Sequence, residues 1–299
     1  MDLFAQIMNT MFGLTSALSP LYLLACVAIA WAIYTRRKVS EPFVEWLLPR
    51  RIWRHKSTRL DLILYGLTVV LSALGIIGRF TVTPAVAAIV AANMPWPPLA
   101  GASVSAIMLA FLLWIIGDFA TYWVHRMHHT TRALWPLHAV HHSAEVMTPI
   151  TTYRQHPLAI LINASLQTVI TGTVLGLLVG ALSPDASLVE IAGVNAFNVI
   201  AIMALTNFHH SHIWIRYWGP LERIFISPAM HQIHHSTNPA HFNRNYGGFL
   251  ALWDWMFGTL YLPEKTEQIE LGLTSKDDAP LMTHRLSRVL ISPLRRMFP

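Results

Sequence analysis

The chain has 299 residues, of which 54% are hydrophobic and only 12% are charged, and its formal net charge is +6. Soluble domains carry about 25% charged residues, so this composition excludes an ordinary soluble enzyme and indicates an integral membrane protein. The basic residues form no stripe with interleaved aromatic residues, so we expect no nucleic-acid partner. The single cysteine, Cys26, excludes a disulfide framework and a thiolate metal site.

Five apolar runs each approach the ~20 residues that a helix needs to cross hydrocarbon. They are residues 18–34, 61–78, 101–124, 158–180 and 187–208. Four prolines interrupt residues 80–100, which we expect to form a re-entrant or surface-lying segment. The predicted fold class is therefore an all-α integral membrane protein, with about four to five transmembrane helices and a cytoplasmic helical cap.

The distribution of lysine and arginine predicts the orientation of these spans. Basic residues crowd the 35–60 loop, only Arg79 lies between Asp61 and Val124, and none occurs from Gln155 to Ile215. The positive-inside rule then places the 35–60 loop, the 125–157 loop and everything after residue 209 in the cytoplasm. We expect a multi-pass protein of the bacterial inner membrane, or of the endoplasmic reticulum if eukaryotic, with its site on the cytoplasmic face.

Histidine is concentrated at this expected cytoplasmic face. Fourteen of the 16 histidines fall between residues 125 and 241, thirteen in the motifs HRMHH, HAVHH, RQHP, NFHHSH and HQIHH and the last at His241. Residues three or four apart share one face of a helix. Three convergent clusters therefore follow, made of His125 and His129, of His138, His141 and His142, and of His231, His234 and His235.

Two residues of the third span share a stripe with the first cluster, because Asp118 and Tyr122 precede His125 and His129 at helical spacing. A carboxylate inside a span is costly and by default functional. We expect Asp118 to accept an imidazole N–H and so fix the tautomer of a ligating histidine, or else to cap a polar pocket. Ser227 and Pro228 predict the N-cap and first turn of the HQIHH helix.

So many histidines on one face predict a site for two metal ions, because one structural zinc needs only four ligands. A zinc hydrolase would place a carboxylate base beside its ligands, as in HExxH, and that motif is absent from the sequence. Haem would need only one or two axial histidines. Two irons that activate dioxygen best explain the number of neutral nitrogen ligands.

The sequence resembles the fatty acid hydroxylase superfamily, also called the sterol desaturase family, of integral-membrane di-iron oxygenases. The resemblance runs from about Trp114 to Pro263, through DFATYWVHRMHH, LWPLHAVHHSAE, TTYRQHP, NFHHSHIW, LERIFISPAMHQIHHS and NYGGFLALWDWMFGTLY. The family's three histidine boxes fall on the three clusters, its RxHP histidine falls on His156, and its fifth-span histidine falls on His210. The resemblance implies a catalytic domain over residues 101–263, between an N-terminal transmembrane region, 1–100, and a peripheral tail, 264–299.

The resemblance implies hydroxylation, desaturation or ether cleavage of a lipid taken from the bilayer, with dioxygen as co-substrate. Electrons must come from an external donor, cytoplasmic or membrane-bound, because the chain has no GxGxxG, haem or flavin motif of its own. Glu145 either orients a ligand, lines the substrate entrance or is an exposed loop carboxylate. Arg154 and Asn245 either bind a polar headgroup or brace the site.

A non-catalytic metal-binding or transport protein is the alternative of a different class. A transporter should show a polar path through the bilayer and often repeated halves. The spans are mostly apolar and no repeat is visible, which favours the enzyme. Within the enzyme class, hydroxylation and desaturation stay open, as do a sterol, a fatty acyl chain, an ether lipid and an ornithine-type lipid as substrate.

Overall fold

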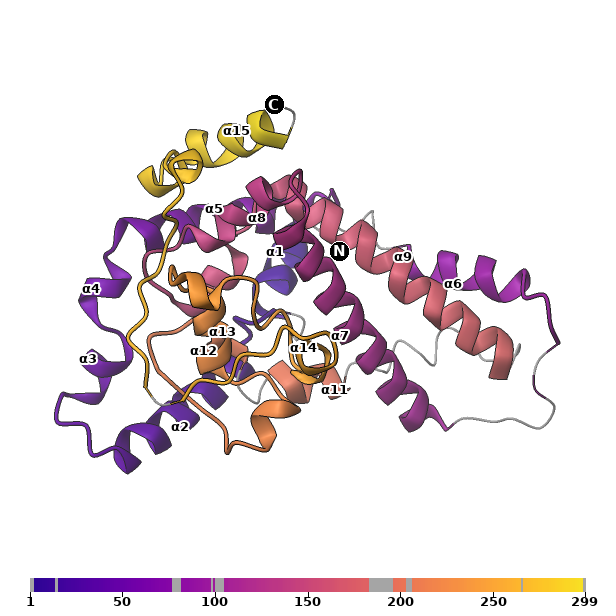
Figure 1. Cartoon of the computed structure of the whole chain (residues 1–299), viewed down its shortest axis with the longest axis horizontal. Helices are drawn as coiled ribbons and strands as arrows, with labels where there is room; N and C mark the ends of the chain where they lie inside the picture. The colour runs from indigo at the N-terminus through magenta and orange to yellow at the C-terminus, as the bar shows by residue number, and fades with distance from the viewer. Residues whose placement is uncertain are drawn as a thin grey trace.

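A computed structural model describes residues 3–13, 16–76, 82–97, 99, 105–182, 196–202, 206–264 and 266–297. Within these ranges the chain forms helices, and the only β pairing is two single bridges, Phe225 with Leu250 and Ser236 with Leu271. The all-α prediction is therefore confirmed for the part of the chain that is described. Figure 1 shows two long helices, α7 and α9, that reach from a mass of shorter helices.

These two helices, α7 (Ala106–Thr130) and α9 (Pro157–Leu182), are long and apolar enough to cross a membrane. They agree with the membrane character that the composition predicts. The apolar helices α2 (Pro20–Arg36) and α6 (Thr83–Ala92) are shorter. The predicted spans 61–78 and 187–208 fall partly on residues 77–78, 187–195 and 203–205, which lie outside the described residues, so the number of spans stays a prediction.

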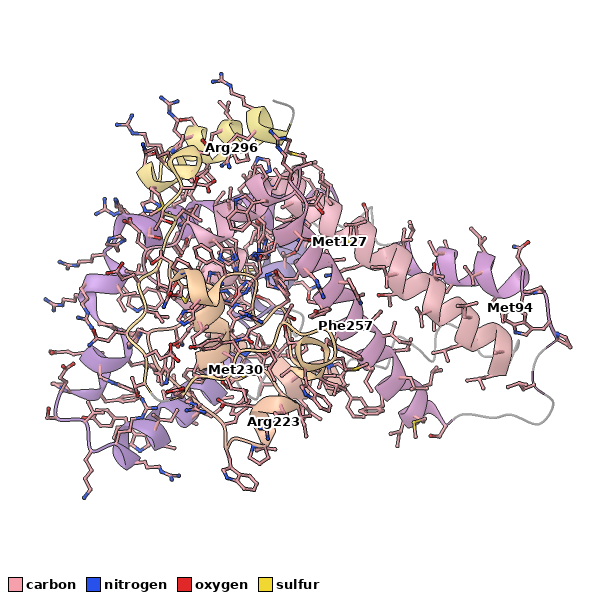
Figure 2. The ribbon with its side chains drawn as sticks, viewed as in Figure 1. Met94, Met127, Arg223, Met230, Phe257 and Arg296 are labelled. Carbon is pink, nitrogen blue, oxygen red and sulfur yellow. The ribbon has the colours of Figure 1, made fainter. Side chains whose placement is uncertain are left out.

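Within the proline-rich segment 80–100, helix α6 packs along α9 (Figure 1). Two glycines of α9 permit this close approach. A Cβ on Gly172 would lie 2.8 Å from the Val86 Cβ, and one on Gly176 would lie 2.6 Å from the Ala87 carbonyl oxygen. Met94 marks the far end of this helix pair in Figure 2, well away from Met127 on α7 and from Met230.

The other helices lie on the opposite side of α7 from the pair α6 and α9 (Figure 1). Before it in the chain come α1 (Leu3–Phe12), α3 (Phe43–Leu47), α4 (Arg50–Trp53) and α5 (Lys56–Ala73). After it come α8 (Trp135–His142), η2 (Pro149–Tyr153), α11 (Ala196–Ala201), α12 (Asn207–His209), η5 (Leu221–Arg223), α13 (Pro228–His234), η6 (Pro239–His241) and α14 (Leu252–Met256). This arrangement brings HAVHH, NFHHSH and HQIHH together with HRMHH at the C-terminal end of α7.

The C-terminal segment adds η7 (Lys276–Asp278), η8 (Leu281–Thr283) and α15 (Leu286–Met297), and α15 packs against α8. Leu281 and Val289 of this segment are buried together with Leu60, Leu64 and Val140. The tail therefore helps to enclose the helix that carries HAVHH.

Candidate metal centre

Three helices present the histidine motifs, and their ends follow from local sequence. HRMHH forms the last turns of α7, HAVHH ends α8, and HQIHH lies on α13 and its C-cap. The Ser227 side chain accepts a hydrogen bond from the Met230 N–H at 3.4 Å, and Pro228 occupies the first turn. The predicted start of the HQIHH helix is therefore confirmed, which places its three histidines on buried faces.

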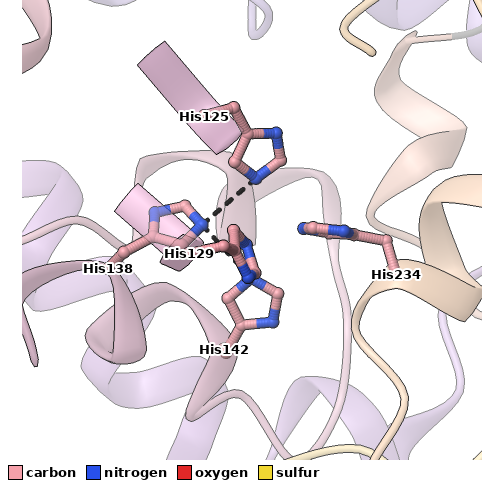
Figure 3. A group of neighbouring side chains, drawn as sticks. All are labelled: His125, His129, His138, His142 and His234. Atoms are coloured by element: carbon pink, nitrogen blue, oxygen red, sulfur yellow. Dashed lines mark hydrogen bonds between the residues drawn. The ribbon is translucent and has the colours of Figure 1, made fainter. Parts of the chain in front are cut away.

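The first histidine group, which we call group 1, draws on all three helices (Figure 3). Its five side chains offer ligand atoms within 4.8 Å of one another: His125, His129, His138, His142 and His234. The Nε2 atom of His138 lies 3.1 Å from that of His125 and 3.2 Å from that of His142. The Nε2 atoms of His129 and His234 are buried without a hydrogen-bond partner among the described residues.

The second group, group 2, lies beside the first and is fully buried. Its four members, which also offer ligand atoms within 4.8 Å of one another, are His141, His210, His231 and His235. The Nε2 atom of His210 lies 3.1 Å from that of His141 and 3.0 Å from that of His231. The structure thus brings His210, rather than the adjacent His209, into the group.

Hydrogen bonds on the outer nitrogens fix which nitrogen faces inward. His125 Nδ1 lies 2.8 Å from the Tyr246 carbonyl oxygen, and His234 Nδ1 lies 2.7 Å from that of Arg244. A carbonyl only accepts, so each Nδ1 carries the proton and each neutral ring turns an unprotonated Nε2 toward group 1. Converging lone pairs repel unless a proton or a cation lies between them, so the group fits a metal ion.

Burial keeps these imidazoles neutral. Burial, together with a neighbouring histidine in each case, lowers the pKa of His141 to about 3 and that of His234 to about 4. Burial and neighbouring histidines also hold the pKa values of His210 and His231 well below 6.5. Neutral imidazole is the form that binds metal, so these residues are ready ligands at pH 7. With no carboxylate in either group, the all-nitrogen set suits zinc, copper, iron or nickel.

Asp118 does not contact a histidine, so the prediction that it accepts an imidazole N–H is wrong. Its carboxylate accepts the Phe249 N–H at 2.8 Å, the Leu250 N–H at 3.1 Å and the Trp253 indole N–H at 2.8 Å. It therefore ties the segment after Tyr246 to α7. The Tyr246 carbonyl oxygen holds His125, so Asp118 supports His125 indirectly, by fixing the segment that follows Tyr246.

The hydroxyl of Tyr122 is likewise occupied within the protein, at 3.0 Å from Thr259 Oγ1 and 3.0 Å from Arg126 Nη1. Asn245 braces the site: its amide nitrogen donates to the Met230 and Tyr261 carbonyls, and its oxygen accepts the Tyr261 N–H. Gly247 completes this turn, where a Cβ would lie 2.4 Å from the Leu250 carbonyl oxygen.

Arg154 braces α8 rather than facing a ligand. Its Nη1 donates to Asp61 Oδ1 at 2.7 Å, its Nε to the Val140 carbonyl at 2.9 Å and its Nη2 to Ser143 Oγ at 2.8 Å. Both charged side chains are fully buried. Because Val140 and Ser143 flank His141 and His142, the guanidinium fixes the position of these two histidines relative to α5.

Glu145 joins the same region to the C-terminal segment. Its carboxylate pairs with Lys56 at 3.1 Å and with His284 Nε2 at 2.5 Å, while His284 Nδ1 accepts from Arg154 at 2.8 Å. Glu145 therefore touches neither histidine group through any of these contacts. His284 is therefore an internal bridge between Arg154 and Glu145.

His156 lies outside both groups, so the placement does not support its predicted role as a metal ligand. Its Nε2 bonds the Leu290 carbonyl at 3.0 Å and its Nδ1 accepts the Leu158 N–H at 3.1 Å, which occupies both ring nitrogens. The remaining histidines of the motifs bond elsewhere. His128 bonds the Val124 carbonyl, His209 that of Ile226, His212 that of Trp46, and His241 pairs with Glu267.

Sequence reasoning missed three residues that shape the site. Asp61, the partner of Arg154, is an aspartate inside a predicted span, and the argument applied to Asp118 would have found it. Thr152 bonds His210 Nδ1 at 2.8 Å, and Asp254 accepts the Tyr246 and Gly247 N–H groups at 2.8 Å each. Nothing in the sequence marks the last two.

Two cavities lie near the histidines. The polar cavity, of about 320 Å³, has His129, His142, His234 and His235 in its wall. The apolar cavity, of about 380 Å³, is lined mainly by aromatic and aliphatic side chains of α7, α11 and residues 217–249. It touches His209 but none of the nine grouped histidines. His209 stacks on His231 with ring centroids 5.0 Å apart.

Comparison with known proteins assigns the chain to a family. The sequence profile of the fatty acid hydroxylase family matches residues 110–259, half of the chain. The chain therefore belongs to the fatty acid hydroxylase family, and this span holds all nine grouped histidines.

Three named relatives share this region. An ornithine lipid hydroxylase of Rhizobium tropici is 35% identical over 162 residues, 54% of this chain and 44% of the relative. An alkylglycerol monooxygenase of Xenopus tropicalis is 34% identical over 157 residues, 52% of this chain and 31% of the relative. A very-long-chain aldehyde decarbonylase of Arabidopsis thaliana is 29% identical over 174 residues, 56% of this chain and 25% of the relative. The match thus covers less than half of each relative's length. No solved structure matches the chain.

Proposed function

We propose that the protein is a membrane-bound di-iron oxygenase that hydroxylates a C–H bond of a lipid. The observation that carries this proposal is the pair of adjacent, carboxylate-free histidine groups, whose inward nitrogens are neutral and converge. Nine histidines exceed what one metal ion needs, and imidazole is a good ligand for iron. When bound, two irons supply the activation of dioxygen that such a reaction requires.

The chain's own residues position this centre. His125, His129, His138, His142 and His234 hold one iron, and His141, His210, His231 and His235 hold the other. Backbone carbonyls of Tyr246 and Arg244 aim two of the ligands. All four residues of group 2 are buried. Their burial excludes water and so limits side reactions of the oxidising centre with solvent.

The substrate is a lipid of the bilayer. Support comes from the two apolar helices beside the site and from the names of the relatives, which are hydroxylases or monooxygenases of an ornithine lipid and an alkylglycerol. Electrons come from an external donor that approaches on the cytoplasmic face, the side favoured by the positive charge of the 35–60 loop.

Comparative lipid mass spectrometry of cells with and without the protein tests this function. A gain of 16 mass units marks hydroxylation, and a loss of 2 marks desaturation by the same centre. The purified protein, produced with added iron, should contain two irons per chain. The His141→Ala variant should lose metal and product while remaining inserted. His55→Asn is the matched control, because His55 caps α5 away from the groups and asparagine is a good N-cap. One zinc per chain, with an unchanged lipid profile in His141→Ala, would overturn the proposal.

A further inference from the structure

We propose that the polar cavity binds the headgroup of the lipid through an acidic group, so that the carbon oxidised lies in or next to the headgroup. The proposal rests on the oxygenase function above and adds the position of attack and the substrate class. The acidic group is a carboxylate or a phosphate, either of which the cavity can recognise by the same chemistry.

The first step is that the polar cavity reaches the centre directly. His129, His142 and His234 of group 1 and His235 of group 2 all line it. The apolar cavity contacts none of the grouped histidines, because the ring of His209 stands between it and His231. A group that enters the polar cavity is therefore the part of the lipid that meets the centre first.

The second step is the chemistry of the cavity wall. Beyond the histidines it offers the apolar side chains of Trp135, Phe242 and Leu273 and the hydroxyl and amide side chains of Ser236, Thr237, Asn243, Thr274 and Ser275. Three of the polar groups already accept a hydrogen bond within the protein. An acyl chain would still remove water from the remaining donors and acceptors, which costs free energy for each group that it desolvates. A volume of about 320 Å³ corresponds to about ten water molecules at ~30 Å³ each, which is the size of a headgroup.

The third step is the charge at the wall. Arg296 of α15 and Asp278 of η7 line the cavity and pair with each other, and Figure 2 shows Arg296 on α15, above the helices that carry the histidines. A guanidinium has five N–H donors. Among the described residues, only the Nη1 atom of Arg296 has a hydrogen-bond partner, which is Asp278 Oδ1. The Arg296 side chain is 27% exposed. The remaining donors match the planar oxygens of a carboxylate or phosphate.

Binding to the purified, full-length protein in detergent tests the recognition step without any turnover. The probes share one short acyl or alkyl chain and carry an ornithine headgroup, a phosphate headgroup or a neutral glycerol. We expect at least one acidic probe to bind roughly tenfold more tightly than the glycerol probe, as for one charge-assisted hydrogen bond. Arg296→Ala should abolish that preference, whereas Arg295→Ala, the neighbouring exposed arginine that does not line the cavity, should keep it.

The Asp278→Asn variant should change the affinity for the acidic probe in the opposite direction. It removes the carboxylate that competes for Arg296, so the affinity for the acidic probe should rise several-fold. Equal binding of all probes by the unmodified protein would overturn the proposed recognition. So would an Arg296→Ala variant that keeps the preference.

The position of attack is read separately, by fragmenting the product that has gained 16 mass units. The extra oxygen should appear in the headgroup or in the carbons attached to it. An extra oxygen in the distal acyl fragment would overturn this inference and leave the oxygenase function intact. The absence of any oxygenated product would instead count against the oxygenase function, while the binding results still decide the headgroup site.

Discussion

The buried pair of Arg154 and Asp61 provides the sharpest test of how the site is held. Both side chains are fully buried, and the ion pair links η2 to α5 with a 2.7 Å contact. Removing one partner of a buried ion pair leaves an uncompensated charge and costs about 3–5 kcal/mol. Arg154→Met and Asp61→Leu should therefore each lower the free energy of unfolding by about that amount.

The double variant should lose much less free energy of unfolding than the sum of the losses in the two single variants. No charge is then left alone, and the main loss is that of four short hydrogen bonds, those of Arg154 to the Val140 carbonyl, Ser143 Oγ and His284 Nδ1 and that of Thr151 to Asp61. At about 1 kcal/mol per hydrogen bond, this loss amounts to about 4 kcal/mol. The difference from the sum of the single variants measures the coupling between the two charges.

The assay is chemical denaturation of all four proteins in mixed micelles, followed by tryptophan fluorescence. Metal content is the second readout: Arg154→Met should bind less metal, because Val140 and Ser143, which Arg154 holds, flank His141 and His142. If the single losses simply add in the double variant, Arg154 and Asp61 do not act as a pair and the reasoning is refuted.

Three further predictions follow from the contacts at the centre. His234→Ala should reduce the metal content from two ions per chain to one or fewer with unchanged helical circular dichroism; full metal content by elemental analysis would contradict its place in group 1. Asp118→Ala leaves three donors without an acceptor, one buried and two half-buried, at up to about 1–3 kcal/mol each, so its melting temperature should fall sharply, and that of Asp118→Asn should fall less. Equal melting temperatures for the unmodified protein and the two variants would show that the contacts to Phe249, Leu250 and Trp253 contribute nothing. In the metal-free protein, the pKa of His141 is lowered to about 3 and that of His234 to about 4, whereas the unfolded chain has values near 6.5. Between these values the unfolded state takes up protons that the folded state does not, so stability is complete above pH 6.5 and declines as the pH falls toward 4; a melting temperature that stays constant from pH 7.5 to 5 would disprove this.

Sequence spacing predicted the site well where it depends on a single helix. The i, i+3 and i+4 rule puts His138, His141 and His142 on adjacent faces of one turn, whatever the rest of the fold does. The structure accordingly gathers nine of the ten histidines that we expected to be ligands. Their division between groups 1 and 2 could not be predicted, because it depends on how α7, α8 and α13 are oriented against one another.

Residues that act through tertiary contacts were harder to assign. The partners of Asp118 lie more than 130 residues away, in the segment Phe249–Trp253, and no periodicity connects them to α7. His156 follows the expected motif but faces the tail, where the Leu290 carbonyl occupies its Nε2. Sequence spacing shows which side chains share a helix face. The hydrogen-bond partner of each side chain depends on the tertiary fold.

The division of HAVHH and HQIHH between the two groups has a consequence for how metal is acquired. The first motif gives His138 and His142 to group 1 and His141 to group 2, and the second gives His234 to group 1 and His231 and His235 to group 2. An ion that orders either helix at one group also places ligands for the other group, and so lowers the entropy cost of the second binding step. Loading is then expected to be cooperative, with the half-filled protein scarcely populated during a titration. Two bound ions would then together join α7, α8, α13 and the C-cap residue of α12 at one point.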